Sequence, residues 1–113
     1  MQILKETSGP QTIYKLKGAE LGETLGEAVV SQTENEYRLH GIFVKQAFRG
    51  KGYGKLIMNT FLREVQAKRV TLCTGLGNIT FFKRFGFEVI DVGDSLISME
   101  KKPVRSKFLA PES

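Results

Sequence analysis

The stretch that decides the fold reads Ile42-Phe43-Val44-Lys45-Gln46-Ala47-Phe48-Arg49-Gly50-Lys51-Gly52-Tyr53-Gly54-Lys55. An apolar segment ends at Val44, a loop with three glycines follows, and a helical pattern begins near Gly52. Glycine lets backbone amides approach a ligand without interference from a Cβ atom. The first amides of a helix have no partner within the helix, and the helix dipole favours an anion there. The stretch therefore predicts a strand, a phosphate-binding loop and a helix.

Two nucleotide motifs fail on this loop. A Walker loop requires a glycine where Arg49 stands and a hydroxyl side chain where Leu56 stands, so nothing is left to hold Mg²⁺. The dinucleotide fingerprint begins at Gly50 and Gly52, but Lys55 occupies the position of its third glycine. The phosphate predicted here therefore belongs to another kind of ligand.

The rest of the chain alternates between strand and helix patterns. Alternating or short apolar runs predict strands at 1–6, 12–17, 27–32, 37–44, 70–74, 87–90 and 95–100. Helical spacing of apolar residues predicts a long helix from about Gly52 to about Ala67. Asn78 is the expected cap of a short helix over 79–85, which Gly86 ends.

This order of elements predicts an α+β fold, with a central sheet flanked by one long and one short helix. Because no composition break occurs, residues 1–100 are expected to form one domain. Residues 101–113 are expected to be a flexible tail.

The length of 113 residues and the composition, with 41% hydrophobic and 26% charged residues, are typical of a globular protein. The lone Cys73 excludes an internal disulfide and a cysteine-based zinc cluster, and we expect no metal. With no run able to span a bilayer and no signal-peptide pattern, we expect a cytoplasmic protein. The net charge of +5 suits nucleic acid, an acidic protein or a phosphorylated cofactor. Lys45, Arg49, Lys51 and Lys55 concentrate that charge at the loop and favour the cofactor.

Two segments carry a resemblance to a known family. The first is Arg49-Gly50-Lys51-Gly52-Tyr53-Gly54, which resembles the acetyl-CoA pyrophosphate loop (Arg-x-x-Gly-x-Gly) of the GNAT superfamily of N-acetyltransferases. The second, Asn78 to Phe87, resembles the family's later segment, in which an Asn and an aromatic helix lead into Gly-Phe. The resemblance covers roughly residues 27–100. Residues 1–26 are short for a family that usually has one or two helices there, which implies a minimal member with a reduced N-terminal part.

The resemblance implies how acetyl-CoA would bind. The sheet would be mixed but mostly antiparallel, and one parallel pair of strands, ending at Val44 and Thr74, would splay apart to admit the pantetheine arm. Loop amides would bind the pyrophosphate, and the edge of the first strand would pair with pantetheine. The implied cofactor contacts are Ile42, Phe43, Val44, Arg49, Gly50, Lys51, Gly52, Tyr53, Gly54, Lys55, Asn78, Phe81 and Phe82.

The implied reaction is direct attack of a primary amine on the thioester in a ternary complex. Phe82 stands where the family often has a Tyr that protonates the leaving thiolate, so that acid is missing. His40 is a candidate general base, Glu36 is a candidate carboxylate base, and Cys73 is a candidate for a covalent route. Each of these residues also has a purely structural interpretation. His40 could be an exposed strand histidine, Glu36 a solvated turn carboxylate, and Cys73 a small buried residue of the core.

We therefore expect an acetyl-CoA-dependent N-acetyltransferase whose acceptor is a small-molecule or protein amine. The alternative is a catalytically weak or inactive module that binds CoA or acyl-CoA, which the phenylalanine at position 82 favours. A basic nucleic-acid-binding domain is disfavoured, because the sequence has no groove-reading or base-stacking motif. No membrane partner is expected, and a homodimer is compatible with the sequence.

Overall fold

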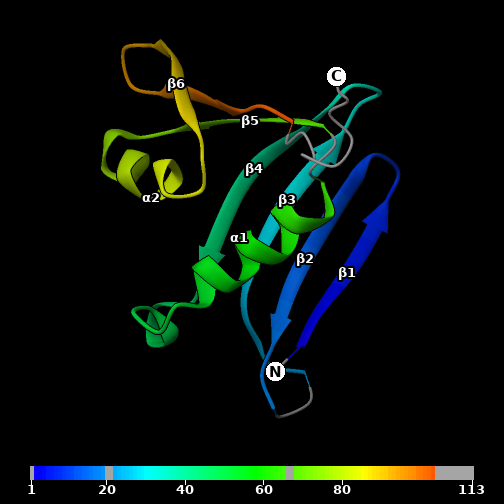
Figure 1. Ribbon diagram of the computed structural model, residues 1–113. Coiled ribbons are helices and arrows are strands. Elements are labelled where there is room, and N and C mark those ends of the chain that lie inside the picture. The colour runs from blue at the N-terminus through cyan, green and yellow to red at the C-terminus, as the bar shows by residue number, and fades with distance from the viewer. Residues whose placement is uncertain (1, 20–21, 66–67, 104–113) are drawn as a thin grey trace, which may run out of the picture.

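The computed structural model describes residues 2–19, 22–65 and 68–103 (Figure 1). Within these ranges seven strands form one sheet, in the order β1-β2-β3-β4-β5-β7-β6. All neighbouring strands are antiparallel except β4 and β5, which are parallel. The strands are β1 (Gln2–Ser8), β2 (Gln11–Lys17), β3 (Thr24–Gln32), β4 (Glu36–Val44), β5 (Arg69–Thr74), β6 (Glu88–Val92) and β7 (Ile97–Lys101). The predicted α+β fold with a mostly antiparallel sheet is confirmed.

Two α-helices accompany the sheet, as predicted. The long helix α1 (Tyr53–Glu64) crosses one face of the sheet, and the short helix α2 (Ile79–Lys83) lies beside β5 and β6 (Figure 1). Two 3₁₀ turns, η1 (Gln46–Phe48) and η2 (Leu76–Asn78), precede them. No helix among the described residues is long and apolar enough to cross a membrane.

The core lies between α1 and the sheet. Phe61 of α1 is fully buried and meets the rings of Tyr14 and Tyr37 edge to face, at centroid distances of 5.5 and 6.2 Å. Such pairs stabilise a core by about 0.5–1.5 kcal/mol beyond their buried area. The Tyr14 hydroxyl donates to Glu64 Oε1 at 3.0 Å, and burial together with this carboxylate raises the pKa of Tyr14 above its ordinary value. This packing fixes α1, and with it the loop that precedes it.

The opposite face of the sheet carries no helix among the described residues. A turn at Gly9 joins β1 directly to β2. This face carries ion pairs such as Lys15–Glu6 at 2.9 Å. By the register of β1 to β4 it also carries the exposed apolar side chains Leu4 and Phe43. An antiparallel sheet can pack one face on the core and leave the other solvated.

Several predicted boundaries were wrong. β3 begins at Thr24 rather than at residue 27, and β4 begins at Glu36, so the predicted turn there is shorter. α1 ends at Glu64 rather than near residue 67, because Val65 leaves helical geometry (φ −114°, ψ 24°) while its side chain stays in the core. Residues 66–67, and 104–113 of the predicted tail, lie outside the described ranges.

The two ends of α2 differ in how well the sequence predicted them. Asn78 makes no side-chain capping hydrogen bond, because η2 already places its backbone near helical geometry (φ −106°, ψ 0°). A capping residue normally has an extended backbone, so the predicted cap is wrong. Gly86 ends the helix as predicted, with a positive φ of 95°. The amides of Gly86 and Phe87 donate to Lys83 and Phe82 carbonyls, which is a Schellman motif.

Candidate active site

The parallel strands β4 and β5 stay paired over only part of their length. Hydrogen-bonded pairing joins Glu36–Leu39 to Arg69–Leu72 and goes no further. Beyond Leu39, β4 continues to Val44 alongside β3, and β5 continues to Thr74 alongside β7. Within the part of the chain that the structure describes, the facing edges of these segments therefore carry backbone groups without a strand partner, and the predicted splay is present.

A bulge in β4 explains where the splay begins. In the register with β3, Val30 faces Leu39 and Val29 faces Gly41, so His40 is an extra residue. A bulge bends its strand and increases the local twist. Because this one follows directly after the last residue paired with β5, it turns the second half of β4 away from that strand.

The splay opens a cleft of about 480 Å³. This volume is within the range of small-molecule and cofactor sites. The lining residues are Leu39, His40, Gly41, Ile42, Phe43, Val44, Arg49, Gly54, Leu72, Cys73, Thr74, Asn78, Phe81 and Phe82. The cleft thus brings together two predicted catalytic residues and eight of the predicted cofactor contacts.

The glycine loop forms one end of this cleft. Gly50 and Gly52 have φ values of 81° and 82°, a left-handed conformation that favours glycine. α1 begins directly afterwards at Tyr53, so its free first amides open onto the loop. The predicted contacts Lys51 and Lys55 are exposed here, and Tyr53 packs against the core. This arrangement suits an anion at the N-terminus of α1.

Arg49 has a structural task in the loop. Its Nε donates to the carbonyl oxygen of Val44 at 2.9 Å, which ties the loop to the end of β4. The prediction from charge gave Arg49 a phosphate contact only. The observed bond leaves the other guanidinium nitrogens available while it holds the loop against the cleft.

Aromatic side chains of α2 form the opposite wall. Phe81 and Phe82 meet edge to face with centroids 5.2 Å apart, and Phe82 also contacts Phe87 at 5.9 Å. Phe82 is only 6% exposed, so most of its ring belongs to the core and one part lines the cleft. The wall is apolar at this point and offers no proton donor.

His40 lies at the cleft on the solvated face of the sheet. Its Nε2 lies 2.7 Å from Ser31 Oγ on β3, and the imidazole is exposed. The contact orients the ring, and the tautomer decides which of the two atoms donates. The predicted general base therefore has a defined position beside the open strand pair.

Cys73 is half-exposed in the cleft, whereas its strand pattern predicted burial. In β5, Leu72 and Thr74 are buried, so Cys73 projects to the opposite, solvated side. Its Sγ lies 3.5 Å from Ser98 Oγ and accepts from Arg38 Nη2 at 3.1 Å. The Ser98 contact and the Arg38 guanidinium lower the pKa of this thiol from its ordinary value.

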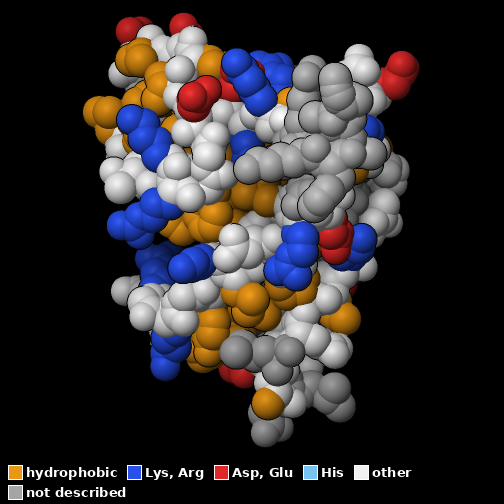
Figure 2. Space-filling model, in the orientation of Figure 1, with side chains coloured by type: hydrophobic (Ala, Val, Ile, Leu, Met, Phe, Trp, Pro, Cys, Tyr) orange, Lys and Arg blue, Asp and Glu red, His pale blue; other side chains and the backbone are white. Residues whose placement is uncertain are grey.

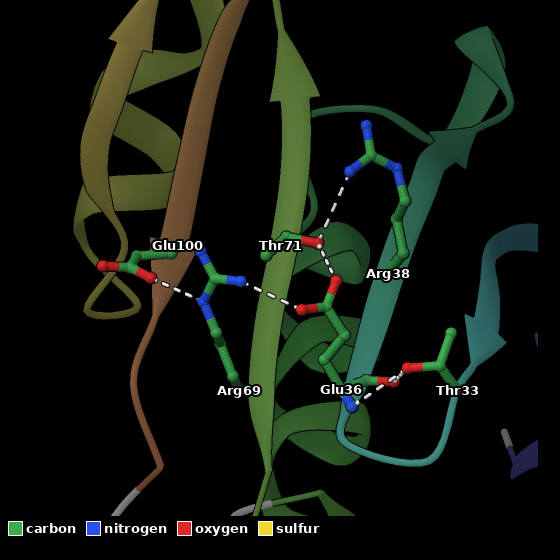
Figure 3. Close-up of polar contacts among 6 residues, drawn as sticks. All are labelled: Thr33, Glu36, Arg38, Arg69, Thr71 and Glu100. Carbon is green, nitrogen blue, oxygen red and sulfur yellow. Dashed lines mark hydrogen bonds and ion pairs between the residues drawn. The ribbon is translucent and has the colours of Figure 1, made fainter.

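Glu36 does not line the cleft. Its carboxylate accepts from Arg69 Nη1 at 2.9 Å and from Thr71 Oγ1 at 3.2 Å, at the paired end of the strands (Figure 3). His40 lies four positions further along the strand, roughly 13 Å away at about 3.3 Å per residue. The predicted role of Glu36 as a base is therefore not supported by its place in the structure, because the parallel pairing draws it into an ion pair.

The sequence predictions did not include Arg38, Ser31 and Ser98, which contact the two candidate catalytic side chains. One signal was available for Arg38, since it lies two residues before His40 and shares its face of the strand. Ser31 and Ser98 come from other strands, and only the sheet register brings them near.

Fold and cleft together describe an α+β domain in which an anion site at a helix N-terminus adjoins an open pair of strands. The family model for the acetyltransferase (GNAT) domain matches residues 12–89. The chain therefore belongs to the GNAT acetyltransferase family, as the two sequence segments predicted. A comparison with curated protein sequences gave no significant match.

Solved structures of other proteins share the fold at low sequence identity. The PaiA N-acetyltransferase of Thermoplasma acidophilum, solved with coenzyme A, is 19% identical with a TM-score of 0.70, over 82% of this chain and 61% of PaiA. The ribosomal-protein-S18-alanine N-acetyltransferase of Escherichia coli is 14% identical with a TM-score of 0.75, over 92% of this chain and 76% of that enzyme. A GNAT family acetyltransferase of Elizabethkingia anophelis, solved with acetyl-CoA, is 15% identical with a TM-score of 0.71, over 83% of this chain and 77% of that protein. The chain thus spans less than two thirds of PaiA and has the shared fold in shorter form.

Proposed function

We propose that this protein is an acetyl-CoA-dependent N-acetyltransferase that transfers an acetyl group to a primary amine. The observation that carries the proposal is the end of β4–β5 pairing at Leu39 and Leu72, directly beside a glycine loop at a helix N-terminus. A strand edge with free amides and carbonyls matches the amides of pantetheine, and the loop matches the pyrophosphate. Membership of the GNAT family supports the same cofactor.

The cofactor would run along β4. Its pyrophosphate would lie on the amides of the loop from Gly50 to Lys55, with the exposed lysines adding charge. Pantetheine would follow the unpaired edge of β4 from Val44 towards Leu39, between that edge and the aromatic wall. A free backbone amide on the unpaired edge of β4, at the thioester end of the arm, would polarise the thioester carbonyl, as in an oxyanion hole.

The reaction would take place at the narrow end of the splay. The amine nitrogen attacks the thioester carbon, the carbon–sulfur bond breaks, and CoA leaves as the thiolate. His40 would accept the proton from the amine, because it lies at the cleft and faces solvent. Phe82 supplies no proton, so solvent would protonate the thiolate. Cys73 offers a covalent route, in which the acetyl group would pass through its Sγ before it reaches the amine.

A second candidate function rests on Phe82. A cleft that binds the cofactor but has no hydroxyl at its aromatic wall suits a module that binds CoA or acyl-CoA without turnover. Both candidates predict binding, and they differ only in product formation.

A two-stage experiment tests the proposal. We expect acetyl-CoA at 100 times its Kd to stabilise the fold by about 2.7 kcal/mol, visible as a rise in melting temperature. Mass spectrometry of a panel of amines, amino acids and peptides then detects acetylated products. A stabilising shift with a product on at least one amine supports the enzyme, and a shift with no product on any amine supports the module. No shift at millimolar acetyl-CoA would overturn both.

A further inference from the structure

A second concave site lies away from the cofactor cleft. It has a volume of about 440 Å³ and sits between the C-terminal half of α1, the end of α2, and strands β5 and β7. The residues that line it are Asn59, Leu62, Arg63, Val65, Lys68, Val70, Arg84, Phe85, Lys101 and Lys102. We call it the basic basin. It shares no lining residue with the cleft between β4 and β5.

The rim of the basic basin is positively charged throughout. The ionisable residues that line it, among those the structure describes, are all cations: Arg63, Lys68, Arg84, Lys101 and Lys102. The ion pairs found among the described residues involve none of them. Figure 2 shows Lys and Arg side chains spread over this face of the molecule. Like charges held around one concavity repel each other, and an anion bound between them would relieve that repulsion.

The floor of the basic basin is apolar. Leu62 and Val65 come from the end of α1, Val70 comes from β5, and Phe85 lies just beyond α2. Phe85 is half-buried, and its ring is fixed edge to face against Phe81 at 5.1 Å. Lys68 is held partly by the Tyr37 ring, with its Nζ 5.4 Å from the centroid. A fixed apolar floor under a cationic rim suits a ligand with a flat apolar part and several negative charges.

We propose that the basic basin binds a small phosphorylated ligand of the nucleotide class, at a site separate from that of acetyl-CoA. The phosphates would lie among the arginines and lysines of the rim, where charge-assisted hydrogen bonds form. The base would lie on the floor against Phe85. Arg63 of α1 and Arg84, which follows α2, would approach the phosphates from two sides.

The shape of the site favours a small ligand over a long one. The cations converge from several elements around one hollow, rather than forming a stripe along which a nucleic-acid backbone would run. The protein's own segment 104–113 is not complementary in charge, because it contains Arg105 and Lys107 against a single acidic side chain, Glu112. A nucleotide of ordinary size matches the volume of the site.

The test uses ATP and inorganic tripolyphosphate as probes, with calorimetry on the full chain in saturating CoA, so that the cofactor cleft is already occupied. The basin variant carries Arg63→Gln, Arg84→Gln and Lys102→Gln, which are all exposed positions. A matched variant carries Lys15→Gln, Lys17→Gln and Lys83→Gln, which removes the same charge outside both the basin and the cofactor cleft. Melting temperatures verify that both variants fold.

We expect ATP to bind the CoA-saturated protein, and the basin variant to weaken ATP binding by about tenfold or more while the matched variant changes it by less than about threefold. Tighter binding of ATP than of tripolyphosphate would show that the base contributes.

Three results would overturn the proposal. One is the absence of ATP binding at millimolar concentration. Another is competition between CoA and ATP, which would assign the basin to the cofactor's own nucleotide end. The last is binding of a single-stranded oligonucleotide, lost in the basin variant, without binding of ATP, which would make the surface a nucleic-acid site.

Discussion

The two ends of the β4–β5 pair are built from opposite chemistry. At the paired end, Arg69 of β5 lies between two carboxylates, with Nη1 2.9 Å from Glu36 of β4 and Nε 2.6 Å from Glu100 of β7 (Figure 3). At the open end, the same two strands present unpaired backbone, a bulge at His40 and a glycine loop. One end joins three strands, and the other leaves room for a ligand.

This difference shows how a sheet can hold a cleft without a gap in its core. The core side chains of β4 and β5, such as Leu39 and Leu72, stay buried up to the point of divergence. Ion pairs on the solvated face then reinforce the short paired segment. Because the paired end is held by packing, backbone and side-chain contacts together, the open end can remain unpaired without the strands separating.

Filling the open end is the change with the largest expected effect. A Cβ built on Gly54 lies 3.7 Å from Val44 Cγ2 and 3.8 Å from the Phe81 ring, so an indole there would occupy the cleft. For Gly54→Trp we expect the affinity for acetyl-CoA to fall by about 100-fold or more, equivalent to about 2.7 kcal/mol. Calorimetric titration measures this. Leu56→Trp, an exposed position outside the cleft in the same turn of α1, is the control and should bind normally.

Replacing His40, which lies where β4 and β5 diverge, should lower turnover and leave cofactor binding almost unchanged. For His40→Gln we expect kcat to fall by about 10²-fold, the lower end of a general-base contribution. The Kd for acetyl-CoA should stay within about threefold. Initial rates on an accepted amine and thermal-shift titrations provide the two numbers. Ser31→Ala removes only the contact that orients the imidazole ring, so it should reduce kcat less than His40→Gln does. An unchanged kcat in His40→Gln would exclude His40 as the general base.

Removing the ion pairs of Arg69 at the paired end should lower the stability of the fold and leave the affinity for acetyl-CoA almost unchanged. Arg69→Met leaves Glu36 and Glu100 facing each other without the cation between them. Since the side chains are partly exposed, we expect the free energy of unfolding to fall by only about 1–2 kcal/mol. Urea denaturation measures it, and Glu100→Gln in the Arg69→Met background should recover part of the loss. A fall in acetyl-CoA affinity larger than the fall in stability would contradict the separation of the two ends.

The smallest expected effect concerns the thiol in the cleft. Because the Ser98 contact and Arg38 lower the pKa of Cys73, its thiolate forms at lower pH than that of a free cysteine. The rate of alkylation by iodoacetamide should therefore rise at lower pH than for free cysteine, and Ser98→Ala should move this rise to higher pH. Bound CoA should slow the reaction at every pH, since Cys73 lines the cleft. A profile unaffected by both changes would place the thiol outside the site.

Much of the site was predictable because its signals are local. The glycine loop, the helix after it and the stop at Gly86 depend on backbone conformations that neighbouring residues dictate. The apolar spacing of α1 likewise predicted which side faces the core. The cap at Asn78 failed for a local reason as well, because a 3₁₀ turn had already taken the place of the extended residue.

The catalytic predictions depended on distant pairings. Glu36 and His40 lie on one strand, and the sequence offered both as candidate bases. The register of β4 against β5 places Glu36 beside Arg69 and leaves His40 at the cleft. The exposure of Cys73 depends in the same way on which side of β5 faces α1.

The amino-acid sequence by itself determined the strand, the phosphate-binding loop and the helix between Ile42 and Leu62, and with them the family. These are short-range properties of glycine spacing, charge and apolar periodicity. Only the tertiary structure decided where the two parallel strands part, which candidate residues meet at that point, and that cations from α1, from β7 and from the segment after α2 surround a second site. Contacts between strands and helices far apart in the chain follow from sheet register and packing, and no local pattern encodes them.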